Sequence, residues 1–599
     1  MREARALEAL LTRHGFTQPV CQLCGKDHHY GHRWEELRNY VEIVTVPDAG
    51  DEFLVCRGMP RSCLDGAAQQ QVHLDRAAAE QLGIQLPRPT LRLIDLTRTA
   101  MHVDSLCAQP AGPISPGVIK KVGEWTLERL PEATKRALDD DSVPSAFLAE
   151  IDSVVLTDLP DVVDLTQVEA RRLLVDLGFC GSAVARVATE SGHDVAHLLG
   201  TLGVGAHRRT FRDYYADLAT RSGVGHPPRQ TFVSTITWNA PTIEVRVDDT
   251  VAATLPSVFD DQRTRTWTGT SDEASLWLLF KKCAGLGAVA NVALAPVVFG
   301  DLPVDSPDAP GRLAVATAAM EEMQDQMRIF SMAGNRAGGM SADVFIYGIR
   351  QFGVPWEDGA EAPSGPHEAE WIKRDVMLGL RSPNYLADVR RRYPMLLEPD
   401  VHAIEKAIGQ PSLAEKLREA WRSDLRDEVD AATKARLAAT TLAARSLWRA
   451  TGRCSSAHLG LARKFLFSHL RKQARTSTPP TAVSNDSGIT GMTEQDVVRL
   501  AEQRLRGVFD DILRHVDPKS LVGAEAELGR RPSPACTLVV PGIDAGRVRD
   551  LPNRRCGDRT SESGQFALDP SVPPPRVRGP GEDRCGLDGE DVVPAAAGE

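Results

Sequence analysis

The sequence has no excess of basic residues, and this lack narrows the range of its partners. Lysine and arginine number 70 against 81 aspartates and glutamates, which gives a formal charge of -11. Proteins that bind nucleic acids usually carry a basic patch, and those that bind single strands interleave it with aromatic residues. No run of basic residues here alternates with aromatics. We therefore expect no nucleic-acid partner.

The sequence also lacks a long uncharged apolar run. The best candidate, residues 284–300, is rich in glycine and alanine and is bounded by Lys281, Lys282 and Asp301. A membrane-spanning helix needs about 20 predominantly apolar residues. The first residues mix both charges and lack the apolar segment of a signal peptide. We expect a soluble, cytoplasmic protein with no membrane partner.

Cysteines are few for the length of the chain. The 11 cysteines are an odd number spread over 599 residues, which is not typical of a disulfide framework. Cys21 and Cys24 precede His28 and His29, and these are residue types that bind structural zinc. However, no second Cys-x-x-Cys follows, and the histidines come too soon for a zinc finger. A zinc site at Cys21 and Cys24 and a polar turn with two free thiols both remain open.

The length and the changes in residue pattern predict several structural units. A chain of 599 residues is too long for one compact core. Residues 1–150 combine short helices with strand-like alternation and are predicted to be a small α+β domain. Residues 155–515 place apolar residues at helical spacing, which predicts a large all-α domain. Residues 516–599 have little periodicity and are predicted to be a disordered tail. The predicted fold class is mainly α.

Helices are predicted wherever apolar residues recur every three to four positions. Ser271 and Ser412 are the expected N-caps of two of these helices. The segment from Phe232 to Trp238 is expected to be extended instead. The predicted helices cover residues 166–189, 194–202, 210–221, 272–298, 312–332, 342–352, 366–380, 385–393, 399–409, 412–452, 457–473 and 493–515.

One histidine lies among small residues on a predicted helix. Helical spacing places His458, Ala462 and Phe465 on one face, and a flat group could approach that face closely. A helix presents a single imidazole to a haem iron in this way. A lone histidine on a helix is nevertheless more often a core or surface residue.

Several segments follow one another in a characteristic order. They are Pro227–Phe232 with Thr237–Asn239, Val344–Phe352, Val389–Pro394, Ala457–Leu459 and Ser487–Gly491. Together these segments resemble the aminopyrrolnitrin branch of the haem-dependent indoleamine 2,3-dioxygenase superfamily, represented by the monodechloroaminopyrrolnitrin synthase (PrnB) family. The resemblance covers roughly residues 155–515.

The resemblance implies a cofactor, haem b, and an iron ligand. His458 matches the proximal ligand of the superfamily, whereas the residues around His469 do not match that motif. Arg350 matches the arginine that binds the substrate carboxylate, a task suited to the two parallel donors of a guanidinium. Alternatively, Arg350 is a surface residue or binds a propionate of the haem.

The resemblance also implies the walls of a substrate pocket. Phe345 and Phe465 are expected to line it, and Ser487 and Thr490 are expected in a loop that closes over the substrate. The helix that contains residues 276–287 is expected to form the distal wall, without a distal histidine. The branch has a functional tyrosine where this chain has Leu466, which puts the particular reaction of the branch in doubt.

The resemblance therefore implies a haem-dependent oxidoreductase of secondary metabolism. It would bind tryptophan or a substituted tryptophan, chlorinated or not, and oxidise or rearrange it with molecular oxygen or peroxide. One alternative is a dioxygenase that cleaves the indole ring to a kynurenine-type product. Another is a non-catalytic sensor that binds haem or an indole. The sequence does not indicate an oligomeric state.

Overall fold

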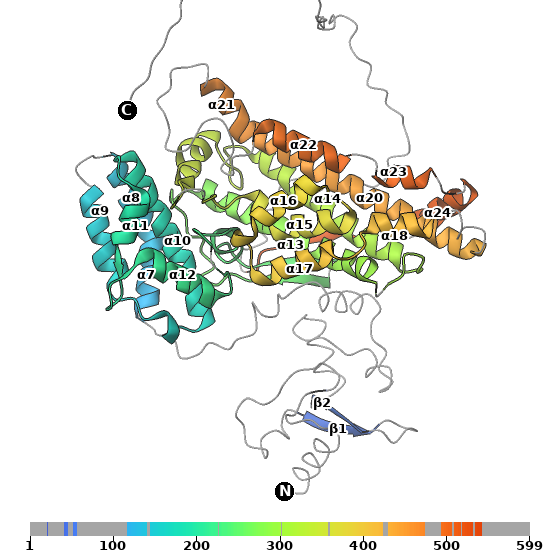
Figure 1. The fold of residues 1–599 in the computed structure, drawn as a ribbon, viewed down its shortest axis with the longest axis horizontal. Coiled ribbons are helices and arrows are strands. Elements are labelled where there is room, and N and C mark those ends of the chain that lie inside the picture. The colour runs from blue at the N-terminus through green and yellow to red at the C-terminus, as the bar shows by residue number, and fades with distance from the viewer. Residues whose placement is uncertain are drawn as a thin grey trace, which may run out of the picture. The chain divides into compact units, whose positions relative to one another are not determined.

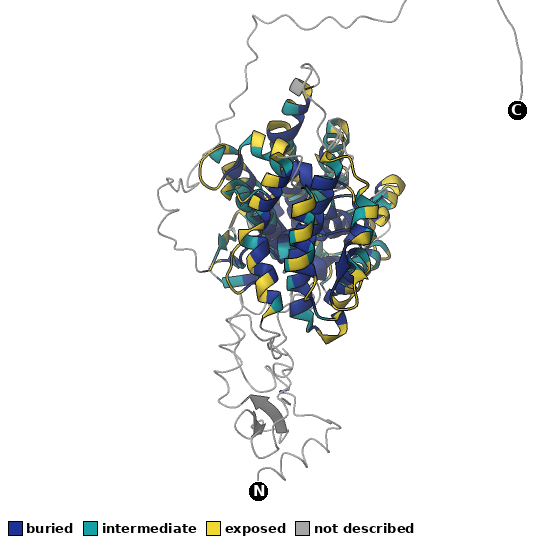
Figure 2. Cartoon of the chain, turned by 90° about the vertical axis from the view of Figure 1, so that its left-hand side faces the viewer, coloured by how far each residue is buried: buried dark blue, intermediate teal, exposed yellow. Residues whose placement is uncertain are grey.

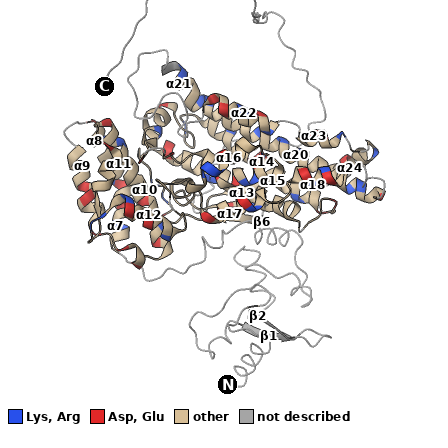
Figure 3. Cartoon of the chain, in the orientation of Figure 1, with Lys and Arg blue, Asp and Glu red and all other residues tan. Residues whose placement is uncertain are grey.

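Helices dominate the structure, a computed structural model, as the sequence predicts (Figure 1). The structure describes Cys21 and residues 41–45, 52–56, 117–139 and 144–541. Within the last range, the residues not described are 226, 249, 301, 358–359, 423–428, 474–492, 506–507, 515, 517 and 531–533. Along these helices, buried faces turn inward and exposed faces turn outward (Figure 2). Basic and acidic residues are interspersed on them (Figure 3).

The first group of helices surrounds α10 (Gln167–Glu190). Thr166 and Glu169 form a capping box at its start: the Thr166 hydroxyl accepts from the Glu169 N–H, and the Glu169 carboxylate accepts from the Thr166 N–H. Its neighbours are α7 (Val118–Glu128), α8 (Leu130–Asp139), α9 (Pro144–Glu150), α11 (Val195–Thr201) and α12 (Phe211–Ser222). The short elements η1 (Ile151–Leu156) and η2 (Val162–Asp164) pack against α7 and α12, respectively. Helices α7, α8 and α9 thus share the core of the central unit, whereas the sequence placed their residues in the first domain.

Three long helices form the centre of the structure. They are α13 (Ser271–Phe299), α14 (Ala309–Ala333) and α20 (Ala431–Ala462), and α14 packs against both of the others. Within the described residues, α13 is the one helix long and apolar enough to cross a membrane, and 89% of its apolar window is buried inside the protein. It is therefore built like the core helix of a soluble protein.

Shorter elements cover these long helices. Helix α15 packs on α13, while α22, α23 and α24 pack on α20. The bounds of the shorter elements are η4 (Val344–Gly348), η5 (Ile349–Gly353), η6 (Gly365–His367), α15 (Ala369–Leu378), α16 (Pro383–Arg391), η7 (Tyr393–Met395), α17 (Glu398–Ile408), α18 (Leu413–Ala420), η8 (Arg463–Phe467), α21 (Ser468–Gln473), α22 (Glu494–Leu505), α23 (Val508–Leu513) and α24 (Pro518–Arg530).

A small antiparallel sheet joins distant parts of the chain. Its strand order is β6 (Thr250–Leu255), β5 (Ile243–Val247), β7 (Cys536–Val539), so that β7 covers one edge of β5. The prediction that disorder begins at residue 516 is therefore wrong, because residues 518–530 form a helix and residues 536–539 form a strand. Pairing between residues nearly 300 positions apart leaves no local pattern in the sequence.

Two short antiparallel strand pairs complete the described residues. One consists of β1 (Val41–Thr45) and β2 (Glu52–Cys56), with Val41 opposite Cys56. The other consists of β3 (Gly203–Val204) and β4 (Arg209–Thr210).

Three local predictions are wrong. The segment predicted to be extended forms the π-helix η3 (Val233–Thr237). Just before it, Thr231 Oγ1 accepts a hydrogen bond from the Ser234 N–H. Burial of this segment overrides the preference of its β-branched residues for strands. The single helix predicted over 412–452 is two helices, α18 and α20, and Asp430 caps the second. Ser412 caps α18 as predicted, but α13 is capped by Thr270 rather than Ser271.

Candidate functional site

A cavity of about 260 Å³ lies among α13, α14, α15, α20, α22 and the short helices η4 and η6. Its wall is mainly aromatic and aliphatic with a polar minority, which is typical of a site for a small ligand or cofactor. The apolar and aromatic members include Phe232, Leu276, Trp277, Phe280, Met327, Phe330, Phe345, Ile349, Phe465, Leu466 and Phe467. The polar and charged members are Ser364, Glu368, Tyr385, Arg392, Ser455, His458 and Arg504, together with the indole of Trp371.

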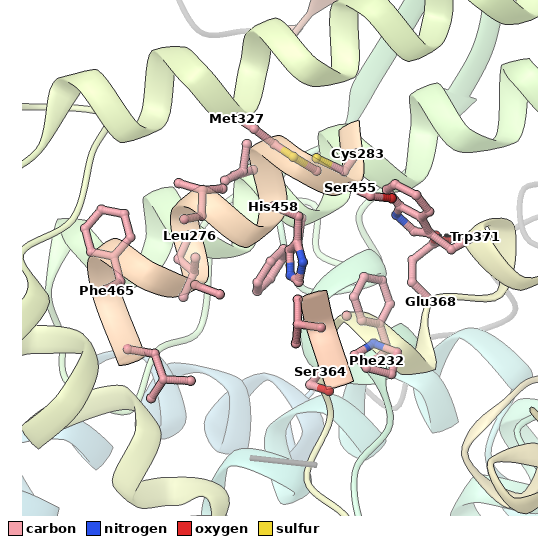
Figure 4. A pocket seen from close by; sticks show the side chains of 18 of the residues that line it. Phe232, Leu276, Cys283, Met327, Ser364, Glu368, Trp371, Ser455, His458 and Phe465 are labelled. Atoms are coloured by element: carbon pink, nitrogen blue, oxygen red, sulfur yellow. Dashed lines mark hydrogen bonds between the residues drawn. The ribbon is translucent and has the colours of Figure 1, made fainter. Parts of the chain in front are cut away.

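His458 projects from α20 into this cavity (Figure 4). The helix continues directly into the π-helical turn η8, and π-turns within helices occur frequently at functional sites. His458, Ala462 and Phe465 all line the cavity, so the face predicted from helical spacing is the face that meets it. His469 lies further on, in α21, and does not line the cavity.

The imidazole of His458 is neutral at physiological pH. Burial, and next the positive charge of Arg504, lower its pKa from 6.5 to about 4. Its Nε2 atom faces Gly365, since a Cβ built on Gly365 would lie 3.8 Å from that nitrogen. Neutral imidazole is the protonation state that binds a metal, and Gly365 places no side chain beside Nε2.

An aromatic wall stands on the α13 side of the cavity. The rings of Trp277 and Phe280 lie 6.1 Å apart, and those of Phe280 and Phe232 lie 6.3 Å apart. Glu273, one turn before Trp277 on α13, is wholly buried and accepts from the Trp277 indole N–H at 3.1 Å. Its two oxygens also accept from the backbone N–H groups of Trp267 and Thr268. Glu273 therefore fixes the orientation of one ring of the wall.

The opposite wall holds a buried ion pair. Arg504 donates to Asp375, with Nη2 2.5 Å from Oδ2, and also to the Ser455 hydroxyl at 3.2 Å. The Tyr385 hydroxyl donates to the same Asp375 oxygen at 2.7 Å. These side chains form their hydrogen bonds with one another. We therefore interpret the group as a rigid support that joins α15, α16, α20 and α22.

Glu368 and Trp371 continue this wall along α15. The Glu368 oxygens accept from the backbone N–H groups of Glu370 and Trp371 and so cap the helix. Burial, and next the charge of Glu370, raise the pKa of Glu368 to about 7. The guanidinium of Arg374 lies 4.0 Å from the centre of the Trp371 ring, which supports the indole from behind.

The structure brings together some of the predicted site residues but not others. His458, Phe345 and Phe465 all line the one cavity. Arg350 is wholly buried and does not line it, although its neighbour Ile349 does. Ser487 and Thr490 lie outside the described residues, so their predicted role stays a prediction.

The predicted zinc site falls mostly outside the structure as described. Cys21 is buried, and Cys24 lies outside the described residues. Within the described part of the chain, no group of three or more histidine, cysteine, aspartate or glutamate residues is arranged to hold a metal ion. Zinc binding at Cys21 and Cys24 therefore stays a prediction.

Sequence reasoning missed much of the polar wall. Ser364 and Gly365 carry only the local signal of a turn, a Gly-Pro pair after a proline-rich stretch. Glu368 and Arg504 carry no local signal, because their role depends on which helices pack together. Arg392 lies within a segment of the resemblance but was not assigned a role.

No family model matches this chain, and no curated protein matches it.

Proposed function

We propose that this protein is a haem-dependent enzyme that binds tryptophan or a substituted tryptophan in the cavity and oxidises or rearranges it. The observation that carries the proposal is His458. It is the one histidine among the described residues that line the cavity, it is neutral, and its Nε2 faces Gly365. Neutral imidazole is the common axial ligand of haem iron.

The residues of the cavity fit a haem group. His458 would hold the iron of haem b, and the small side chains of Gly365 and Ala462 would leave room for a flat ring near it. When bound, haem supplies the oxygen chemistry. The protein contributes orientation, exclusion of water and a low dielectric around the ring.

The aromatic wall suits an indole. Trp277, Phe280 and Phe232 present rings against which a planar apolar substrate packs, and Phe345 and Phe465 extend the apolar lining. Glu273 holds Trp277 in place, so the substrate would meet a surface that needs no rearrangement on binding. We propose that these residues position the indole, while Ser487 and Thr490 are proposed to close over it.

The cavity lacks a tyrosine at the position next to Phe465, where Leu466 lines the wall. The described hydroxyl-bearing residues of the wall are Ser364, Tyr385 and Ser455, and Tyr385 already donates to Asp375. The absence of the branch's tyrosine favours the alternative of indole-ring cleavage more than it favours a rearrangement. Both reactions need the same substrate position, and their products differ.

Spectroscopy of the full-length protein tests the proposal. Protein purified from haem-replete cells should show a Soret band, and tryptophan should shift that band in the ferrous form. Mass spectrometry of the products, with oxygen or with peroxide, then separates a kynurenine-type product from a rearranged or hydroxylated indole. Colourless protein that takes up no added haem would refute the proposal. Haem and indole binding without turnover would identify a sensor instead.

A further inference from the structure

Arg392 and Ser364 leave hydrogen-bond donors unused in the wall of the cavity. Arg392 is 5% exposed and lines the cavity, and its buried Nε has no hydrogen-bond acceptor. The Ser364 hydroxyl is also buried and lines the cavity, and its O–H donates to no acceptor. A buried donor without an acceptor destabilises the folded protein, and a charged donor does so more strongly. These two donors therefore indicate that a further group with acceptor atoms binds in the cavity.

Both side chains are linked to η6. Ser364 directly precedes this helix, and its backbone N–H donates to His367 Nδ1 at 3.3 Å. The positive charge of Arg392 is, after burial, the next cause that lowers the pKa of His367. Arg392 is therefore close enough to η6 to act on His367, and it lines the same cavity as Ser364 and Gly365.

Arg392 is the cation of the described wall that has an unused hydrogen-bond donor. Its Nη2 is paired with Asp388 at 2.5 Å, which holds one end of the guanidinium and leaves Nε available. Arg504, the other arginine of the wall, directs Nε, Nη1 and Nη2 to Asp375 and Ser455. Arg350 does not reach the cavity. The carboxylate that also lines the wall, Glu368, is occupied by the N-terminus of α15.

We propose that Arg392 and Ser364 form a carboxylate receptor, so that the cavity takes a flat aromatic ligand with an anionic oxygen at one end. A guanidinium N–H and a hydroxyl both donate, and a carboxylate offers the matching acceptors. The inference rests on the proposed function in placing the aromatic ligand in this cavity. The carboxylate comes either from the indole amino acid or from a propionate of haem.

Matched ligand pairs distinguish these two sources. For the substrate, the full-length protein is titrated by calorimetry with indole-3-propionate and with its methyl ester, which keeps the ring but has no charge. For the cofactor, haem is compared with haem dimethyl ester by absorbance titration. Each ligand is measured on the wild type and on Arg392→Gln. Arg390→Gln is the control, because Arg390 lies two residues before Arg392 but is half exposed and paired with Glu405.

We expect Arg392→Gln to weaken binding of one acid by about 10- to 100-fold and to leave its ester unchanged. Loss with indole-3-propionate assigns the receptor to the substrate, and loss with haem assigns it to a propionate. Ser364→Ala should cause a smaller loss for the same ligand. The proposal is overturned if the wild type binds neither acid better than its ester, or if Arg392→Gln keeps the preference.

The proposed function can fail separately from this inference. A protein that binds no haem but prefers indole-3-propionate through Arg392 retains the carboxylate receptor without the haem enzyme. Circular dichroism and thermal denaturation of each variant exclude a general loss of folding. If Arg392→Gln does not fold, Arg392→Lys keeps the charge and loses the planar donors, and it should weaken binding of the acid selectively.

Discussion

Gly365 of η6 lies next to His458 of α20 in the wall of the cavity, and a Cβ at Gly365 would lie 3.8 Å from His458 Nε2. This spacing is ordinary van der Waals contact for one methyl group, so the protein would accept alanine there. A larger side chain would fill the space in front of the nitrogen. The relation between these two residues decides what can approach the imidazole.

Gly365→Val should therefore prevent haem binding although His458 is still present. The branched side chain occupies the approach to Nε2, and Gly365→Ala should give an intermediate loss of affinity. Haem affinity is measured by titration of the Soret absorbance. Gly460→Ala is the control, because Gly460 is on the same helix as His458 and a Cβ there meets nothing within 4 Å. Full haem affinity in Gly365→Val would mean that Nε2 is not the iron ligand.

His458→Ala should lose the Soret band or change the ligation spectrum, because it removes the imidazole that lines the cavity. His469→Ala should leave the spectrum unchanged, since His469 lies outside the cavity wall. Absorption and electron paramagnetic resonance spectra of the ferric proteins check both outcomes. Added imidazole should restore ligation to the alanine variant at position 458. An unaltered spectrum in that variant would assign the iron to another residue.

Glu273→Gln should loosen the aromatic wall. The amide keeps one oxygen but turns an N–H₂ group toward donors that previously met a carboxylate, at a cost of about 1–3 kcal/mol in unfolding free energy. One amide oxygen cannot accept from all the donors that the carboxylate serves, so the Trp277 indole is held less firmly. We therefore expect a shift of tryptophan fluorescence and weaker binding of indole ligands. Glu419→Gln, a substitution of an exposed glutamate, is the control. Unchanged fluorescence and affinity would remove the positioning role of Glu273.

Asp176 should make the folded protein less stable as the pH rises. Burial raises its pKa from 3.8 to about 7, although Arg265 lies 3.4 Å away and lowers it. Between these values the folded state keeps a proton that the unfolded chain has released, so this contribution decreases from about pH 4 to about pH 7.

Asp176→Asn removes that titration. The stability of the variant relative to the wild type should therefore increase with pH in this window, by up to about 1.4 kcal/mol per pH unit. Urea denaturation at several pH values measures the difference, with the exposed Asp325→Asn as the control. A difference that does not vary with pH would show that Asp176 is ionised throughout.

The helical character and part of the site could be predicted from the sequence because they depend on local patterns. Apolar spacing indicated the long helices, and helical geometry placed His458, Ala462 and Phe465 on one face, which all line the cavity. Phe345 was assigned to the pocket from a resemblance, and it also lines the cavity.

The rest of the site depends on contacts between distant segments. Arg504 comes from α22 and its partner Asp375 from α15, and neither residue has a distinctive neighbourhood in the sequence. Arg350 matched a motif, but the packing of η5 decides that Ile349 lines the cavity and that Arg350 is buried elsewhere. Tertiary contacts of this kind override local signals, as they also do where η3 replaces the predicted extended segment.

The pairing of β7 with β5 limits where the chain can be cut. A fragment that stops at residue 515, where the helical domain was predicted to end, would lack β7 and α24. It would leave one edge of β5 unpaired, and exposed strand edges promote aggregation. The fragment would also expose the side of α20 against which α24 packs, and α20 is the helix that carries His458. A shortened protein intended for haem-binding work therefore has to retain residues through at least 541.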